Sequence, residues 1–516
     1  MQLHGVDKLA ERAMDERKYP EPKRWGRRFL AALALLALLL VGGFWGWIVN
    51  GRGELDRQVA AYRAAGEPIE MGDFVVVGVA DDDNAAVSLR EAARLDEKSE
   101  IWKTYVGFTR EFRLPLTDKE VAAIRDVVAA NPAAFEQVDE AMKRNSLDWK
   151  IPFKSPAIQI LLPDLHQQRV LARLMVHRAM LNDQRGDHAA AIADLRRAMF
   201  VGRAVGQQPV LIANLVSVGI ASMTADALLE MSPGLKIGNG AGDARAADAR
   251  DVSQLIAELL DDKPYGESYR RGLHGERAIQ LDTARCLADG RLSLTQIAGP
   301  GAGPGAAPRA NPLASAASFF ARPMALADGL LMIRHTTALT RAYGASPNWP
   351  TYRSTAPPFP PEAEASKFRH LLARALLPSF ERAAQVNFRG MAARRAAAIA
   401  LAARRYALDH DGKLPAKLDD LAPNYLPSVP LDPFAAPPQP LKCINDPDKP
   451  IIYSVGEDGL DDGGSEMPAK KKTPNPGRWD KLDAVFPLKL QPRALPAEME
   501  EDQPPATTPP TTAPAE

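Results

Sequence analysis

The stretch FLAALALLALLLVGGFWGWIV, residues 29 to 49, decides how the rest of the chain is organised. It carries no charge, and at about 1.5 Å per residue its length matches the roughly 30 Å hydrocarbon core of a bilayer. Phe44, Trp45 and Trp47 gather at one end, where membrane helices place an interfacial aromatic belt. The alternative is a buried core helix, but the stretch is apolar on every face over its whole length. We predict one transmembrane helix.

The charges on either side of this stretch predict its orientation. The preceding basic residues are Arg12, Arg17, Lys18, Lys23, Arg24, Arg27 and Arg28, and the following ones are Arg52, Arg57 and Arg63. The excess on the N-terminal side predicts that residues 1 to 28 form a cytoplasmic basic segment. A cleaved signal peptide is the alternative, but GFWGWIVNGR offers no small-residue cleavage site. We therefore expect an uncleaved anchor in the inner (cytoplasmic) membrane and a periplasmic or extracytoplasmic ectodomain.

The composition predicts the class of this ectodomain. Lys+Arg and Asp+Glu both total 64, so no global field attracts nucleic acid, and aromatic residues at 6% offer few stacking platforms for single strands. We expect no nucleic-acid partner. Ala, Leu and Arg are frequent while β-branched residues are sparse, which favours helix. The predicted fold class is mainly α.

Helical patterns fill residues 50 to 298, the predicted helical ectodomain. An exit helix is expected over residues 55 to 65, and Asp83 or Asn84 suits the cap of a helix that starts near residue 85. Residues 167 to 231 read as a helical hairpin that turns at Gly186 and resembles one tetratricopeptide unit. No second copy follows at a period near 34, so we predict a single αα-hairpin inside a larger helical domain.

Composition shifts divide the remaining chain into four parts. Residues 299 to 316 are dominated by glycine and proline and predict a linker or loop. Residues 317 to 365 combine a helix with a proline-rich connection, and residues 366 to 490 combine a long helix with a small α+β module. Residues 491 to 516 have little apolar surface to bury, so a disordered tail is expected.

The C-terminal module is predicted from a helix and two short strands. The helix carries Ile399 and Tyr406 on one stripe, and the strands PLKCIN and PIIYSVG flank the turn DPDK. Because alternate residues of a strand share a side, Tyr453 and Val455 should both face that helix.

Several motifs of this module carry a family resemblance. The helix is followed by LP..LDDL, by LDPF, and by a hairpin that ends in YSVGEDGLDDGG. Over about residues 390 to 466 this order resembles the globular end of the major pseudopilin of type II secretion, where a comparable acidic loop binds calcium. Ala435 and Ala436 replace the expected glycine-containing turn, and no prepilin-peptidase site precedes the anchor. The whole chain rather resembles large single-pass bacterial envelope proteins, a resemblance that implies no activity.

The acidic loop after the second strand is the candidate metal site. Glu457, Asp458, Asp461 and Asp462 supply hard oxygen ligands, and the loop glycines let the backbone wrap an ion such as calcium. An EF-hand is excluded, because a register that starts at Asp458 puts Ala469 at the bidentate position. The alternative is a solvated turn in which Asp accepts backbone N–H groups. Both interpretations stay open.

Catalytic motifs give no support to an enzyme. The chain has no GxSxG, HExxH or GxxxxGK[ST] pattern, and the consecutive residues Asp409, His410 and Asp411 point in different directions at a helix end. We expect a non-enzymatic protein whose ectodomain binds or scaffolds another envelope protein. The alternatives are an accessory component of a secretion or pilus-type system and an envelope hydrolase with an unrecognised carboxylate site. Cys286 and Cys443 are expected to be free thiols.

Overall fold

A computed structural model describes most of the chain and is mainly helical. The described residues are 25–76, 78–108, 112–238, 243–298, 312–365, 369–377, 379–470 and 475–489. Most of the predicted cytoplasmic segment (1–24), most of the Gly/Pro-rich linker (299–311) and the predicted tail (491–516) lie outside these residues. The described part is mainly helical, as predicted.

The helices cover most of the described chain. In the first half of the chain the helices are α2 (Trp25–Ala64), α3 (Ala85–Ala92), α4 (Glu100–Gly107), α5 (Asp118–Ala130), α6 (Pro132–Met142), α7 (Pro163–Gln184), α8 (His188–Val205), α9 (Leu211–Met231) and α10 (Ala249–Leu260). The later ones are α11 (Lys263–Asp289), α12 (Leu294–Ala298), α13 (Pro312–Phe320), α14 (Arg322–Ala345), α15 (Trp349–Thr355), α16 (Pro361–Ala365), α17 (Leu371–Leu376) and α18 (Ser379–Asp409). Short 3₁₀ turns include η1 (Met71–Phe74) and η3 (Leu418–Leu421).

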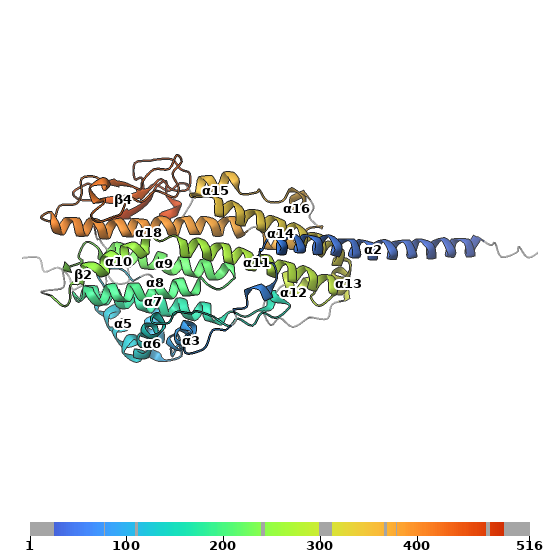
Figure 1. The fold of residues 1–516 in the computed structure, drawn as a ribbon, viewed down its shortest axis with the longest axis horizontal. Helices are drawn as coiled ribbons and strands as arrows, with labels where there is room; N and C mark the ends of the chain where they lie inside the picture. Colours follow the sequence, from blue (N-terminus) through green and yellow to red (C-terminus); the bar gives the residue numbers. More distant parts are fainter. Residues whose placement is uncertain are drawn as a thin grey trace, which may run out of the picture.

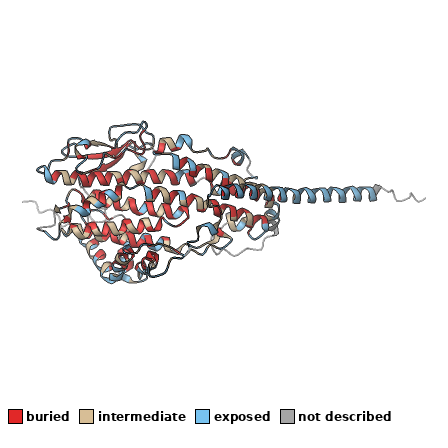
Figure 2. Cartoon of the chain, in the orientation of Figure 1, coloured by how far each residue is buried: buried red, intermediate tan, exposed pale blue. Residues whose placement is uncertain are grey.

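Helix α2 joins the predicted transmembrane helix and the predicted exit helix into one element of 40 residues, about 60 Å long. Its first half projects from the body and is exposed (Figures 1 and 2). From Ile48 onward it packs on the body, where Leu55 and Val59 share a buried cluster with Leu326 and Ile333 of α14. The structure therefore confirms an N-terminal apolar helix long enough to cross a membrane.

A second helix, α9, is also long and apolar enough to cross a membrane, but it serves as the central helix of the body. It is 61% buried over its apolar stretch, against none for α2. Its neighbours are α7, α8, α11 and α18, which run alongside it (Figure 1). Helices α7 and α8 form the predicted hairpin, and Gly186 at the turn has the left-handed φ of 75°.

The C-terminal module contains one more strand than predicted. Strands β3 (Lys442–Ile444), β4 (Ile451–Ser454) and β5 (Ala484–Pro487) form an antiparallel sheet in that order. A second, minimal sheet pairs β1 (Ile237–Gly238) with β2 (Ala247–Asp248). Residues of the three-stranded sheet belong to the same core cluster as the helices of the body, so the core continues across the predicted domain boundaries.

The predicted side for Tyr453 is wrong. Ile452 and Phe486 join the main core, whereas Tyr453 joins Ile451 and Val485 in a separate buried cluster on the other face. The acidic loop folds back over this second face, and Gly464 lies against Ile451 and Tyr453. Both faces of β4 are therefore covered, and all four of its residues are buried. The alternation of side chains along the strand could not show which of the two faces meets the helices.

Candidate functional site

Three adjoining cavities follow helix α11 along the side of the body. Their volumes are about 190, 290 and 550 Å³. Ile151 and Phe153 line both the first and the second cavity, and Gln207 and Arg271 line both the second and the third. We call these three joined cavities the α11 groove. It runs from Gln280 to Lys263, which at about 1.5 Å per residue is roughly 26 Å.

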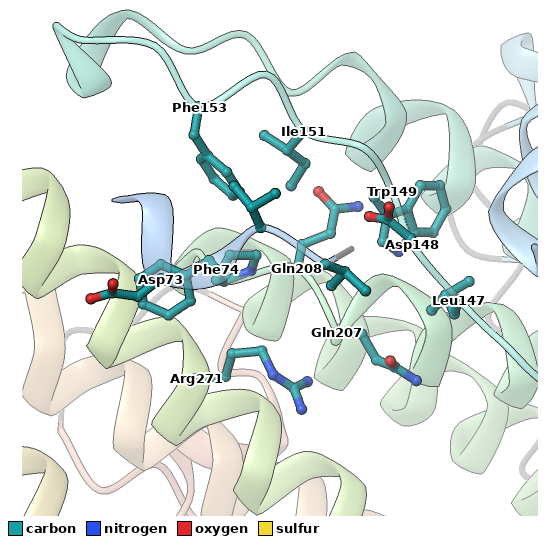
Figure 3. Close-up of a pocket in the computed structure, with 13 residues that line it drawn as sticks. Asp73, Phe74, Leu147, Asp148, Trp149, Ile151, Phe153, Gln207, Gln208 and Arg271 are labelled. Carbon is teal, nitrogen blue, oxygen red and sulfur yellow. The ribbon is translucent and has the colours of Figure 1, made fainter. Parts of the chain in front are cut away.

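Two glycines of α11 bring the loop between α8 and α9 against the helix. A Cβ atom on Gly275 would lie 1.7 Å from the carbonyl oxygen of Pro209, and one on Gly272 would lie 3.0 Å from Cα of Leu211. Only glycine permits such a close approach of two backbones. This contact places Gln207 and Gln208, which precede Pro209, beside Arg271 at the centre of the groove (Figure 3).

The opposite wall is an extended segment that side chains hold in place. The side-chain amide of Asn84 donates to the carbonyl of Asp148 at 2.8 Å, and its oxygen accepts the Asp148 N–H at 2.9 Å. The indole N–H of Trp149 donates to the carbonyl of Ala204 at 2.9 Å. Arg90 donates to the Trp149 carbonyl. This wall is therefore fixed before any ligand arrives.

Arg271 is the distinctive residue of the groove. Among the residues that the structure describes, none forms an ion pair or hydrogen bond with its guanidinium. Burial lowers its pKa, and the charge of Glu267 one turn earlier opposes this. Asp73 and Asp148 line the same cavity, but their carboxylates accept backbone N–H groups, those of Ile69 and Glu70 and that of Lys150 respectively. Arg271 thus lies in a partly desolvated site where it forms no ion pair with any described residue, although the charge of Glu267 lies nearby.

A second unpaired donor lies on the floor of the groove. Gln208 is 2% exposed, and its Nε2 has no hydrogen-bond partner within the described part of the chain. Figure 3 shows its amide directed toward Ile151 and Trp149. An unpaired buried donor costs about 1–3 kcal/mol, so this amide is a local cost to the fold beside the groove.

The two ends of the groove differ in chemistry. The end far from α2 is cationic: Arg144 forms no ion pair with any described residue, Arg203 lies 3.4 Å from Glu258, and Lys263 lies 4.0 Å from Glu267. The end nearer α2 is lined by the apolar residues Met71, Ile151, Phe153, Ile158, Ile160, Leu162, Val210, Ile212 and Ile279. Glu276 lies among them, accepts the Leu211 N–H at 3.1 Å, and burial raises its pKa.

The acidic loop predicted to bind calcium lies elsewhere, at the edge of the three-stranded sheet. Glu457 pairs with Arg389, and Asp461 pairs with Lys442 and accepts the Tyr453 hydroxyl. Asp458 accepts the Leu460 N–H at 3.0 Å. Burial, and after it the charge of neighbouring Asp462, raises the pKa of Asp483.

Among the described residues, no group of three or more His, Cys, Asp or Glu is arranged to hold a metal ion. Calcium binding by this loop stays a prediction. Melting of the full chain with calcium and with a chelator tests it, since an ion at a hundredfold excess over its Kd would stabilise the fold by about 3 kcal/mol.

The two cysteines are free, as predicted. Cys286 is buried and lies 3.1 Å from Oγ of Ser155, and burial raises the pKa of its thiol. A buried thiol with a raised pKa is a poor nucleophile, so Cys286 is a structural residue.

Sequence reasoning missed the α11 groove. The available signal was RGLHG, residues 271 to 275, because two glycines three positions apart inside a helix indicate a close backbone contact on one face. That pattern predicts a close backbone contact but does not identify the loop that makes it.

Comparisons with protein-family models, with curated proteins and with solved structures found no match for this chain. No relative therefore supplies an activity, a ligand or a set of site residues. The case for a function rests on the groove and on the anchor helix.

Proposed function

We propose that this chain is a non-enzymatic protein of the bacterial inner membrane, anchored by α2, whose extracytoplasmic body binds an extended acidic segment of another envelope protein in the α11 groove. The observation that carries the proposal is Arg271, a partly buried guanidinium that forms no ion pair with any described residue, in a cavity that aromatic and polar side chains line together. A charge held in this way is strongly attracted to an incoming carboxylate.

The dimensions and the polarity of the groove suit an extended peptide. At about 3.3 Å per residue, a length of roughly 26 Å holds about eight residues. A carboxylate near the middle would meet Arg271. Apolar side chains would occupy the end near Phe153, and further acidic residues would favour the end near Arg144.

A hydrolase receives less support from the same residues. General acid–base chemistry needs titratable groups that converge on one substrate atom. In the groove, the carboxylates of Asp73, Asp148 and Glu276 each accept a backbone N–H within their own wall. These acids hold the walls together, which is a structural role.

A second candidate is an accessory component of a secretion or pilus-type system. It is supported by the order of α18, η3 and an antiparallel sheet, which the pseudopilin resemblance implies, and by the acidic loop after β4. This candidate and the first are compatible, because a component of such a machine also binds a partner.

Selection of octapeptides displayed on phage, against the full chain in lipid nanodiscs, tests the proposed function. We expect enriched peptides to share one acidic residue flanked by apolar residues. Replacing that acid by its amide, or making Arg271→Gln, should weaken binding roughly ten- to hundredfold, since a charge-assisted hydrogen bond contributes about 1.5–3 kcal/mol. Arg271→Lys should keep part of the affinity. Equal binding of acidic and amide peptides would contradict the proposal.

A further inference from the structure

Helix α13 lies against the anchor helix, although the two are far apart in the sequence. The ring of Phe319 stacks on that of Phe44, with 5.1 Å between the centroids, and the ring of Phe320 meets Phe44 edge-on at 6.3 Å. The Leu294 N–H donates to the hydroxyl of Ser318 at 3.1 Å, which ties α13 to α12. Figure 1 shows α13 beside the base of the projecting part of α2.

The aromatic residues at this place are unusually exposed. Phe319 is 40% and Phe320 is 63% exposed, and on the neighbouring turn of α2 Trp45 is 52% and Trp47 is 49% exposed. Together with Phe44 they form an aromatic collar where the anchor enters the body. Large exposed aromatic groups in one place indicate a surface that another apolar phase covers, and aromatic belts are typical of the membrane–water interface.

The position of the aromatic collar along α2 indicates that the apolar phase covering it is the lipid bilayer. Phe44 lies five residues before the end of the charge-free stretch at Val49, or about 7.5 Å along the helix. Helices that lie in the membrane interface bury their apolar face by about 5–10 Å. The guanidinium of Arg322 lies 4.9 Å from the ring centroid of Phe319. With the collar in the membrane interface, this cation would lie at the height of the lipid headgroups.

We propose that α13 is a second membrane contact, which inserts Phe319 and Phe320 into the lipid interface beside the anchor helix. The inference rests on the proposed membrane anchoring by α2. Two contacts restrict the tilt of the body more than one helix can. Because α11 packs on α14, and α14 follows α13 directly, the contact also sets the direction of the α11 groove relative to the membrane.

Site-directed spin labelling of the full chain tests this inference without altering the cysteines. A p-acetylphenylalanine residue that carries a ketone-reactive nitroxide replaces Phe320, Leu38 or Leu460 in turn, in nanodiscs of phosphatidylcholine and phosphatidylglycerol. These three side chains are similarly exposed, at 63%, 69% and 64%, so they differ mainly in their position on the molecule. The measurement is the ratio of collision rates with oxygen and with a water-soluble nickel complex.

We expect a ratio at position 320 several-fold above that at position 460 and below that at position 38. If position 38 lies in lipid while position 320 behaves like position 460, the second contact is wrong and the anchor stands. If position 38 also behaves like position 460, the anchor itself is wrong, and the second contact fails with it.

Discussion

Arg271 and Arg394 carry the same guanidinium on two contacting helices, α11 and α18, but their surroundings differ. Arg394 is 1% exposed, pairs with Asp262 and lies 3.8 Å over the ring of Tyr265. Arg271 has no such partner among the described residues. The first arrangement stabilises the fold, whereas the second leaves a partly desolvated cation without an ion-pair partner among the described residues.

The contrast between these two arginines makes a prediction about stability. Arg271→Gln should leave the free energy of unfolding unchanged or raise it by up to about 1 kcal/mol, because it removes a partly desolvated charge that forms no ion pair with a described residue. The matched change Arg394→Gln should lower it by about 1–3 kcal/mol, because it removes one of the two arginine partners of Asp262. Denaturant unfolding of the full chain measures both. A large loss for Arg271→Gln would show that this residue is structural and would weaken the proposed function.

Helix α11 makes its groove through the backbone as much as through side chains. Gly275 sits where a Cβ atom would collide with the carbonyl of Pro209, while a Cβ atom on Gly266, in the same helix, would meet no atom of the described residues within 4 Å. Glycine costs a helix about 0.5–1 kcal/mol relative to alanine. At position 275 the helix keeps glycine despite this loss of stability, because the loop between α8 and α9 approaches too closely for any other side chain.

The two glycines should therefore respond to alanine with opposite signs. Gly266→Ala should raise the free energy of unfolding by about 0.5–1 kcal/mol. Gly275→Ala should lower it by about 1–3 kcal/mol, since the loop must move away from the helix. Thermal melting of the two variants gives the comparison. Gly275→Ala should also weaken binding of an acidic peptide, because it displaces Gln208; equal stability of the two variants would contradict the close contact.

The whole molecule has a long axis set by α2, with the body at one end of the helix (Figure 1). If the N-terminus is cytoplasmic, the described body lies entirely outside the cytoplasm. Trypsin added to the outer face of spheroplasts should then digest the body, and trypsin added to sealed inverted vesicles should leave it intact. Digestion in the inverted vesicles alone would reverse the topology.

The sequence by itself determined the elements whose causes are local. A charge-free stretch of sufficient length predicted the apolar part of α2, Gly186 predicted the turn of the αα-hairpin, and two short runs that flank the turn DPDK predicted β3 and β4. Each depends on hydrogen bonding and burial within a few neighbouring residues. Strand β5 was missed, because it is four residues long and a long connection, residues 455 to 483, separates it from β4.

Only the tertiary structure decided which face of a strand meets the core and which charge stays unpaired. The side of Tyr453 depends on the acidic loop that folds over it, and the isolation of Arg271 depends on segments from residues 71 to 76 and 144 to 153 that approach α11. A local pattern states how apolar or charged a residue is. Whether a distant segment supplies its partner is settled by packing between elements, and that is why the α11 groove could not be predicted from the sequence.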